Sequence, residues 1–381
     1  MSKKIKIALI TERRADYSRF KPLLEIFRRD KSIEYYLIVT GLHLLNKHGK
    51  TINEIKKDGF KIYKKIEMFN NNYKGDGLSM VKSMGNVLIK IPGILKKIKP
   101  NLILAGFDIG ANFSFVVSGA HLNIPTAHIQ GGELSGSIDE SLRHAMSKFS
   151  NFHFVANLDA KKRLVRMGEK EKNIFIVGCP SIDTLKGAKM VKTNLLNRKY
   201  NFNFNKEYAC MLQHPVTSEN TSSKFQISQT IKALKLSKIP VFIILPNNDS
   251  GYLEIIKEIK LSNYNWASTV SIEEYKTILK NCAFLIGNSS SGIHEAATFK
   301  KPVINIGTRQ HKRLRSNNVL DAKYDYKEIK RKINFCLENK KFIKKVKMVK
   351  NLYGDGSSAK KMFKIIKNLD LKINTQKINT Y

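Results

Sequence analysis

Short apolar runs alternate with amphipathic stretches along the first half of the chain. The runs are continuously apolar, a pattern typical of parallel strands covered on both faces. Helical patterns cover 17–29, about 78–98 and 110–123 between them. The expected strands are 4–11, 35–41, 101–108, 125–130, 152–157 and 174–180. Strands that alternate with helices predict a doubly wound α/β domain.

A second series of the same kind follows a lapse in the pattern at about 186–206. Its expected strands are 208–215, 240–247, 265–270, 283–290 and 302–307. The chain is therefore predicted to be α/β, with two Rossmann-like doubly wound domains. The expected boundaries are 1–190 for the first domain, 206–345 for the second, and 346–381 for a basic helical tail that packs back towards the first.

Length and composition agree with two folded domains, since 381 residues with 42% hydrophobic content can bury two cores. The cysteines are scattered without a CxxC pair, which favours buried free thiols and a reducing compartment. They are Cys179, Cys210, Cys282 and Cys336. The start "MSKKIKIALIT" resembles a signal peptide, but Lys6 interrupts its apolar run, and a first strand is preferred. No window reaches the ~20 apolar residues of a membrane span, so we expect a cytoplasmic protein.

The formal charge of +37 admits two interpretations. A basic surface would suit nucleic acid, an anionic membrane face or a phosphorylated substrate. Alternatively, a lysine-rich composition leaves lysines on solvated faces everywhere. The basic residues are spread along the chain and are not gathered with aromatics. The second interpretation is preferred, and neither nucleic-acid binding nor membrane insertion is expected. Residues 91–100 could contact a membrane surface, but the end of a helix on the protein surface is the preferred interpretation of this stretch.

Polar residues stand where the expected strands end. They are Asp108, Glu133, His214, Asn247 and Ser289. Ligands of doubly wound sheets lie outside the carboxyl ends of the strands. Five such placements over two domains predict one active site in the interdomain cleft.

The stretch "GNSSSGIHEA" (287–296) runs from an expected strand into a helix. Ser289 and Ser290 would stand at the helix N-terminus, where N–H groups and hydroxyls can hold a phosphate. A serine N-cap explains the same residues. Glu295 suits a pair of sugar hydroxyls, such as those of a ribose, or a solvated face. Arg309, at the next strand exit, is the cation expected to reach the cleft.

Three carboxylates occur within "HIQGGELSGSIDESLRHA" (128–145). Glu133 follows a Gly-Gly turn, where the backbone can approach a ligand closely. Asp139, Glu140 and Arg143 would begin the next helix, where acidic residues are favoured and an Asp139–Arg143 ion pair is possible. For His128 and His144 a packing role is as plausible as a chemical one. Asp16 and Tyr17 are interpreted as turn and packing residues.

Six motifs in this order resemble the hydrolysing UDP-N-acetylglucosamine 2-epimerases of sialic-acid biosynthesis. They are "RRADYS" (13–18), "HIQGGELSGSIDESLRHA" (128–145), "GCPSID" (178–183), "QHPVTSE" (213–219), "GNSSSG" (287–292) and "PVINIGTRQ" (302–310). The resemblance implies a GT-B-like pair of domains in a homodimeric enzyme that converts UDP-N-acetylglucosamine and water to N-acetylmannosamine and UDP.

The resemblance also implies which residues contact the substrate. The catalytic group would be Asp108, Glu133, Asp139, Glu140, Arg143 and His214. The nucleotide contacts would be Arg14, Ser18, His214, Asn247, Val270, Ser289, Ser290, Glu295 and Arg309. The chain lacks an HExxH spacing, paired cysteine ligands and a GxGxxG stretch, so neither a metal nor NAD is expected, and no cofactor.

The chain departs from the family at Ile109. Members usually carry an arginine after the aspartate that corresponds to Asp108. Loss of a guanidinium removes a bidentate donor. This leaves the nucleotide base and the sugar open.

Four rival functions remain. The same chemistry on a GDP- or UDP-linked 2,4-diacetamido-2,4,6-trideoxyglucose would supply legionaminic acid. A non-hydrolysing 2-epimerase would return UDP to the sugar. A GT-B glycosyltransferase would need an acceptor, and a nucleotide-sugar sensor would need no catalytic carboxylate.

Overall fold

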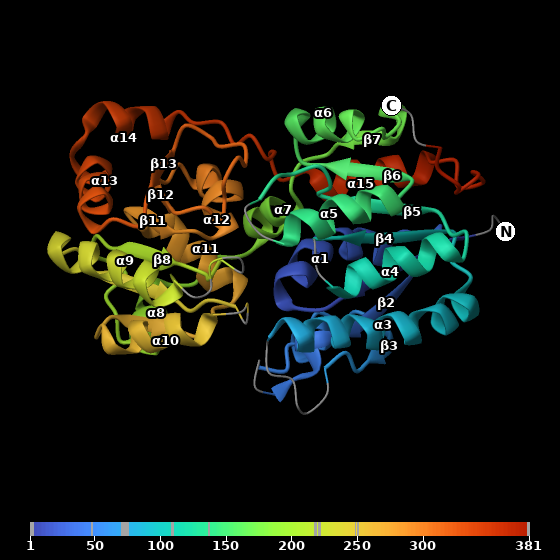
Figure 1. The fold of residues 1–381 in the computed structure, drawn as a ribbon, viewed down its shortest axis with the longest axis horizontal. Coiled ribbons are helices and arrows are strands. Elements are labelled where there is room, and N and C mark those ends of the chain that lie inside the picture. The colour runs from blue at the N-terminus through green and yellow to red at the C-terminus, as the bar shows by residue number, and fades with distance from the viewer. Residues whose placement is uncertain are drawn as a thin grey trace. The chain divides into compact units, whose positions relative to one another are not determined.

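The computed structural model describes residues 4–46, 49–69, 76–107, 110–135, 138–216, 219, 222–247, 249 and 251–378. The chain forms two compact units. Unit 1 comprises Met1–Glu133, Asp139–Thr184 and Gly356–Tyr381, and unit 2 comprises Leu134–Ile138 and Leu185–Asp355. Figure 1 shows the strands and helices of each unit, coloured along the chain.

Unit 1 contains a seven-stranded sheet in the order β3-β2-β1-β4-β5-β6-β7, in which each strand pair is parallel. The strands are β1 (Ile5–Thr11), β2 (Ile33–Thr40), β3 (Ile62–Ile66), β4 (Leu102–Gly106), β5 (Thr126–Ile129), β6 (Phe152–Val155) and β7 (Ile174–Ile176). The central strands β4, β5 and β6 are buried along their whole length. This explains why their sequences are uniformly apolar rather than alternating.

Helices cover both faces of this sheet. They are α1 (Arg14–Arg29), α2 (Ile52–Lys57), α3 (Gly77–Ile98), α4 (Gly110–His121), α5 (Ile138–Phe149), α6 (Leu158–Arg166), α7 (Pro180–Gly187) and α15 (Ser358–Asn368). One face packs against α1 and α15, through Phe20, Phe27 and Met362 among others. The other packs against α3 and α4, through Val87 and Phe115 among others. The C-terminal helix α15 therefore belongs to the same unit as the N-terminus (Figure 1).

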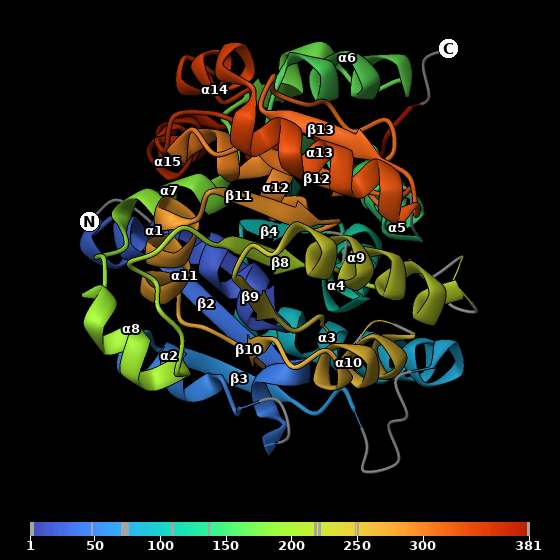
Figure 2. The same ribbon diagram turned by 90° about the vertical axis from the view of Figure 1, so that its left-hand side faces the viewer.

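Unit 2 contains a six-stranded parallel sheet in the order β10-β9-β8-β11-β12-β13, which can be followed from bottom to top in Figure 2. Its strands are β8 (Ala209–Leu212), β9 (Val241–Ile244), β10 (Asn265–Ala267), β11 (Phe284–Gly287), β12 (Val303–Ile306) and β13 (Val319–Ala322). Its helices are α8 (Thr193–Tyr200), α9 (Ser223–Ser237), α10 (Tyr252–Leu261), α11 (Ile272–Asn281), α12 (Ser290–His294), α13 (Tyr326–Glu338) and α14 (Lys340–Lys347). The α/β class and the two doubly wound sheets predicted from the sequence are confirmed.

The units divide at other residues than the sequence analysis expected. The stretch at about 186–206, where the pattern lapses and the boundary was expected, contributes Leu196 and Phe204 to the core of unit 2. Val346, expected in the tail, also packs in unit 2. These segments show no strand pattern, because their apolar side chains recur at helical or irregular spacing. The same side chains nevertheless pack in the core of unit 2.

Two edge strands, β3 and β13, were not expected. The three central residues of β3 are exposed, and β13 is only partly buried, so neither shows the apolar run of a central strand. All four cysteines are buried free thiols, as predicted. Burial raises the pKa of the Cys210 thiol well above its usual range and that of Cys282 to about 12.

Helix α3 corrects the expectation that no stretch could span a membrane. Among the described residues it is the one helix that is long enough and apolar enough to cross a membrane, judged by length and composition alone. Its residues Val87, Ile91 and Leu95 pack against the sheet of unit 1, while Val81 and Ile89 are exposed. It serves as a covering helix of the sheet in this structure.

Candidate functional site

In unit 1 the residues after β5 form a tight turn that ends at Glu133. Gln130 and Gly132 both have positive φ, of 61° and 77°. A Cβ on Gly132 would overlap the carbonyl oxygen of Ala160 in α6. Glycine is required there both by conformation and by space. The Gly-Gly pair thus lets the chain turn sharply against α6 and brings Glu133 to the carboxyl end of β5.

Glu133 is only 4% exposed, and its contacts fix both its backbone and its side chain. The amide Nε2 of Gln130 donates to the carboxylate Oε1 at 3.1 Å. The guanidinium Nη1 of the buried Arg143 donates to the main-chain oxygen of Glu133 at 2.8 Å. Arg143 therefore holds the turn across ten residues of sequence. Gln130 was not singled out from the sequence, although it stands in the same motif.

Asp139 and Glu140 lie in the first turn of α5 and are half-buried. Glu140 contacts His144, with 3.8 Å between Oε1 and Nε2. Burial and the charge of Arg143 lower the pKa of His144, against the opposing effect of Glu140. His144 is consequently neutral near pH 7, so its contact with Glu140 is not an ion pair at that pH.

Arg14 and Ser18 lie four residues apart on α1, after β1. The Asp16 carboxylate between them accepts from the backbone N–H groups of Glu12 at 2.8 Å, Arg13 at 2.9 Å and Tyr17 at 3.0 Å. Asp16 thereby supplies a partner for the N–H group of the N-cap residue Arg13, which has none within the helix. The turn role predicted for Asp16 is confirmed. Asp108 and Ile109 lie outside the described residues.

In unit 2 His214 lies two residues after the end of β8 and is 8% exposed. The buried Asn288, which follows β11, holds the His214 backbone at two points. Its Oδ1 accepts from His214 N–H at 2.7 Å, and its Nδ2 donates to His214 O at 2.8 Å. The ring Nδ1 accepts from the backbone N–H of Asn247 at 3.4 Å, which leaves the proton of a neutral ring on Nε2.

The serines after β11 are half-buried, and the hydroxyls of Ser289 and Ser291 form a chain with that of Tyr275. Ser289 is the N-cap of α12, and its hydroxyl accepts from the backbone N–H of Ser291 at 3.4 Å. The hydroxyl of Ser291 lies 3.2 Å from that of Ser289 and accepts from Tyr275 at 2.8 Å. Because α12 has five residues, its dipole is small, which weakens the phosphate argument from a helix terminus. The hydroxyls remain as donors.

Arg309 follows β12, and its guanidinium reaches back towards the same strand ends. Its Nη1 donates to Asn288 O at 3.4 Å, and its Nη2 lies 3.6 Å from a carboxylate oxygen of Asp249. Gln310 donates to Asn288 O at 2.9 Å. Asn288, which the sequence analysis did not single out, thus links the residues that follow three neighbouring strands, β8, β11 and β12. Its position directly after an apolar strand was the available signal.

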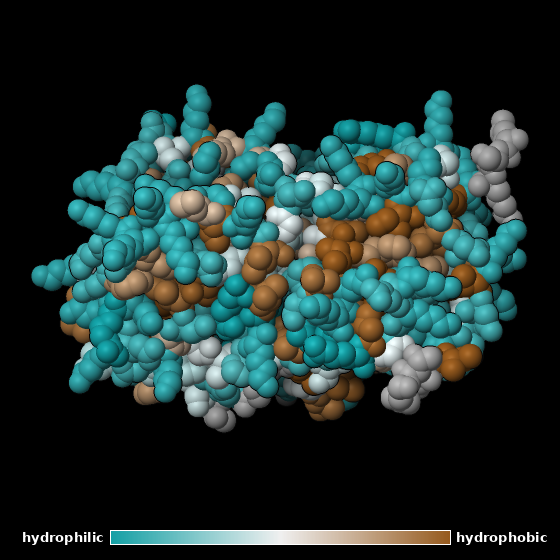
Figure 3. Space-filling view, turned by 90° about the horizontal axis from the view of Figure 1, so that it is seen from above, coloured by the Kyte–Doolittle hydropathy of each residue, from teal (hydrophilic) through white to brown (hydrophobic). Residues whose placement is uncertain are grey.

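The expected residues that the structure describes are distributed over both units. Those of unit 1 are Glu133, Asp139, Glu140 and Arg143, with Arg14 and Ser18 on α1. Those of unit 2 are His214, Asn247, Ser289, Ser290 and Arg309, with Val270 after β10 and Glu295 at the end of α12. No cluster of three or more potential metal ligands occurs in the part of the chain that the structure describes. Hydrophilic side chains cover most of the face seen in Figure 3 and do not gather in one place.

Comparison with known proteins relates the chain to one enzyme family. A family model described as UDP-N-acetylglucosamine 2-epimerase matches residues 25–367. A relative from Legionella pneumophila subsp. pneumophila, UDP-N,N'-diacetylbacillosamine 2-epimerase (hydrolyzing), is 36% identical over 370 residues, with 96% of each chain covered. UDP-N-acetylglucosamine 2-epimerase from Neisseria meningitidis serogroup B is 34% identical over 327 residues, with 85% of each chain covered.

The fold is similar to that of a solved member of this family. The crystal structure of UDP-GlcNAc 2-epimerase from Neisseria meningitidis bound to UDP-GlcNAc matches with a TM-score of 0.82 over 96% of this chain and 100% of that chain, at 16% identity. At this identity the likeness concerns the fold. It agrees with the GT-B-like architecture expected from the sequence.

Proposed function

Because the chain belongs to the UDP-N-acetylglucosamine 2-epimerase family, we propose that it is a hydrolysing 2-epimerase. It converts UDP-N-acetylglucosamine and water to N-acetylmannosamine and UDP. The observation that carries this proposal is the buried Glu133, whose backbone is held by Arg143 and whose carboxylate is oriented by Gln130. A fixed carboxylate is what proton transfer at carbon requires.

The reaction must remove the C2 proton of the sugar, which is barely acidic. Departure of UDP from C1 leaves oxocarbenium-like charge, which acidifies the C2–H bond. Elimination to a glycal therefore needs a base and a stabilised leaving group. Addition of water on the face that gives the manno configuration then needs an acid and an oriented water. We assign the base and acid to Glu133 and Asp108, in either order, with Asp139 and Glu140 in support.

Unit 2 supplies the groups for the leaving UDP. The hydroxyls of Ser289 and Ser290 and the guanidinium of Arg309 are donors suited to a diphosphate. The Nε2–H of His214 is a further donor. Glu295 suits the ribose hydroxyls, and Asn247 and the Val270 backbone suit the base. In unit 1, Arg14 and Ser18 complete the nucleotide contacts.

A second substrate is supported by the Legionella relative, which is named for UDP-N,N'-diacetylbacillosamine and matches nearly the whole chain. That sugar carries an acetamido group at C4 and no hydroxyl at C6, but C1 and C2 are as in N-acetylglucosamine. The same elimination and hydration apply to it. The two substrates differ only at C4 and C6 of the sugar, so the residues that contact these positions would set the specificity.

Incubation with each UDP-sugar separately tests the proposal. We expect UDP and the free 2-epimer in equal amounts, identified by phosphorus and proton NMR, with one substrate preferred in kcat/KM. Formation of the 2-epimeric UDP-sugar without free UDP would instead identify a non-hydrolysing enzyme. Release of UDP only when an acceptor sugar is added would identify a glycosyltransferase.

A further inference from the structure

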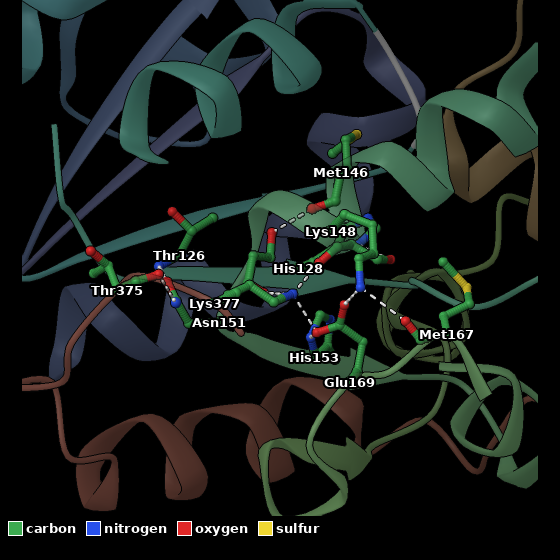
Figure 4. A network of polar contacts seen from close by, with 12 residues as sticks. Thr126, His128, Met146, Lys148, Asn151, His153, Met167, Glu169, Thr375 and Lys377 are labelled. Carbon is green, nitrogen blue, oxygen red and sulfur yellow. Dashed lines mark hydrogen bonds and ion pairs between the residues drawn. The ribbon is translucent and has the colours of Figure 1, made fainter. Parts of the chain in front are cut away.

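Glu169, after α6, is a carboxylate with 2% side-chain exposure that lies far in sequence from the groups above. It accepts from Nε2 of the fully buried His153 at 2.9 Å, and its other oxygen lies 3.3 Å from Nζ of Lys148 (Figure 4). Burial would raise the pKa of Glu169, but the hydrogen bonds from His153 and Lys377 and the charge of Lys377 outweigh it and bring the pKa to about 2. Burial lowers the pKa of His153, so a neutral ring donates to an ionised carboxylate.

Lys377 reaches this carboxylate from the C-terminal tail. The segment after α15 packs Leu371 and Ile373 against the core of unit 1. Asn151 then donates to Thr375 O at 3.1 Å. The Nζ of Lys377 lies at the end of this path, where it donates to Glu169 Oε2. Burial lowers the pKa of Lys377, against the opposing effect of Glu169.

The same ammonium also caps α5. It donates to Ser147 O at 3.0 Å and to Ser150 O at 2.8 Å, which are carbonyls at the C-terminal end of that helix. A cation is favoured beside the carbonyls at the end of a helix. All three donor positions of the ammonium are therefore used, two of them at the C-terminal end of the helix that carries Arg143.

Ser147 connects this cap to the turn that bears Glu133. Its hydroxyl donates to Arg143 O at 3.1 Å and lies 3.0 Å from Nδ1 of His128 in β5. A Cβ on Gly131 would lie 2.9 Å from the same hydroxyl and 2.8 Å from His128 Nδ1. The Gly-Gly turn thus rests on Ser147, whose carbonyl is held by Lys377 and whose helix delivers the Arg143 guanidinium to Glu133 O.

We propose that Lys377 is a positioning residue: through its contacts with Ser147 and Ser150 it fixes the register of α5 against β5, and thereby the placement of Arg143 and Glu133. The tail is then part of the catalytic unit. This inference rests on the proposed function for its effect on turnover, but its structural effect can be measured without substrate.

The test compares Lys377→Met with Lys377→Arg and with Lys372→Met, a matched change at an exposed lysine of the same tail. We expect Lys377→Met to lower kcat about tenfold, with KM and the Kd for UDP within twofold of the parent. Lys377→Arg should restore most of kcat, and Lys372→Met should change nothing. Hydrogen exchange should rise in peptides that span 128–147.

A double variant separates positioning from stability. Lys377→Met leaves Glu169 with one charge partner fewer, so the melting temperature should fall. Lys377→Met/Glu169→Gln removes the buried charge as well, and we expect it to recover the melting temperature but not kcat. Recovery of both would reduce Lys377 to a stabilising residue and overturn the proposal. Unchanged exchange in 128–147 would also overturn it, even if the protein proved inactive on every UDP-sugar.

Discussion

The polar groups after the strands of unit 1 and those of unit 2 are held in different ways. In unit 1 the key carboxylate and guanidinium, Glu133 and Arg143, are nearly inaccessible, at 4% and 3% exposure. In unit 2 the serines and Arg309 are half-buried, whereas Asn288, which lies behind them, is fully buried. Under the proposed function, the first arrangement would fix the acid or base and the second would leave donors open for the diphosphate.

This difference indicates a division of labour. A proton-transfer group must hold its geometry through the reaction, which buried partners ensure. Groups that bind a diphosphate must exchange water for ligand oxygens, which partial exposure allows. We therefore expect substitutions in unit 1 to change turnover and those in unit 2 to change UDP affinity.

The largest effect is expected for Glu133→Gln. The amide cannot take up a proton, so kcat should fall roughly a thousandfold, within the range of general acid–base contributions. The Kd for UDP, measured by calorimetry, should stay within twofold. Glu171→Gln, at an exposed carboxylate of the same unit, is the control and should be fully active. A comparable loss of UDP binding in Glu133→Gln would break the division between the units.

A smaller effect is expected for Asn288→Ala. It removes both hydrogen bonds to the His214 backbone, and unsatisfied buried groups cost about 1–3 kcal/mol in stability. We expect kcat/KM to fall about a hundredfold, because a displacement of a catalytic group by about 1 Å has an effect of this size. Asn288→Asp keeps the acceptor for His214 N–H and should retain more activity. Equal activity of Asn288→Ala and the parent would show that the position of His214 does not matter for the reaction.

Arg309→Lys should weaken UDP binding by about tenfold, because an ammonium cannot offer the paired donors of a guanidinium. The turnover number at saturation should change little. Lys312→Arg, at an exposed cation of the same segment, serves as the reference and should bind UDP normally. If Arg309→Lys lowered kcat and left the Kd for UDP intact, unit 2 would have a role in the chemistry.

The smallest effect concerns acid stability. The folded pKa of Glu169, about 2, lies below its ordinary value of 4.5. Its contribution is therefore present above pH 4.5 and is lost as the pH falls towards 2. Below pH 4 the parent should lose about 1 kcal/mol more per pH unit than Glu169→Gln, in denaturant titrations. Parallel curves for both proteins would show that folding does not lower the pKa of Glu169.

The sequence predicted those parts of the molecule whose signals are local. Continuous apolar runs identified the central strands, and the residues that follow them identified most of the candidate site. Contacts between residues that are distant in sequence could not be predicted from local patterns. The clamp by Asn288 joins residues 74 positions apart, and the contact of Lys377 with Glu169 spans 208. The edge strands β3 and β13 were missed because an edge exposes side chains and loses the apolar pattern.

The central claim is that a carboxylate of unit 1 removes the C2 proton while UDP departs from C1. It is tested most directly by the reaction in D2O, followed by proton NMR of the sugar product. The account predicts free 2-epimer that carries deuterium at C2 in every molecule formed. Product that retains its original hydrogen at C2 would contradict elimination, and with it the role of Glu133.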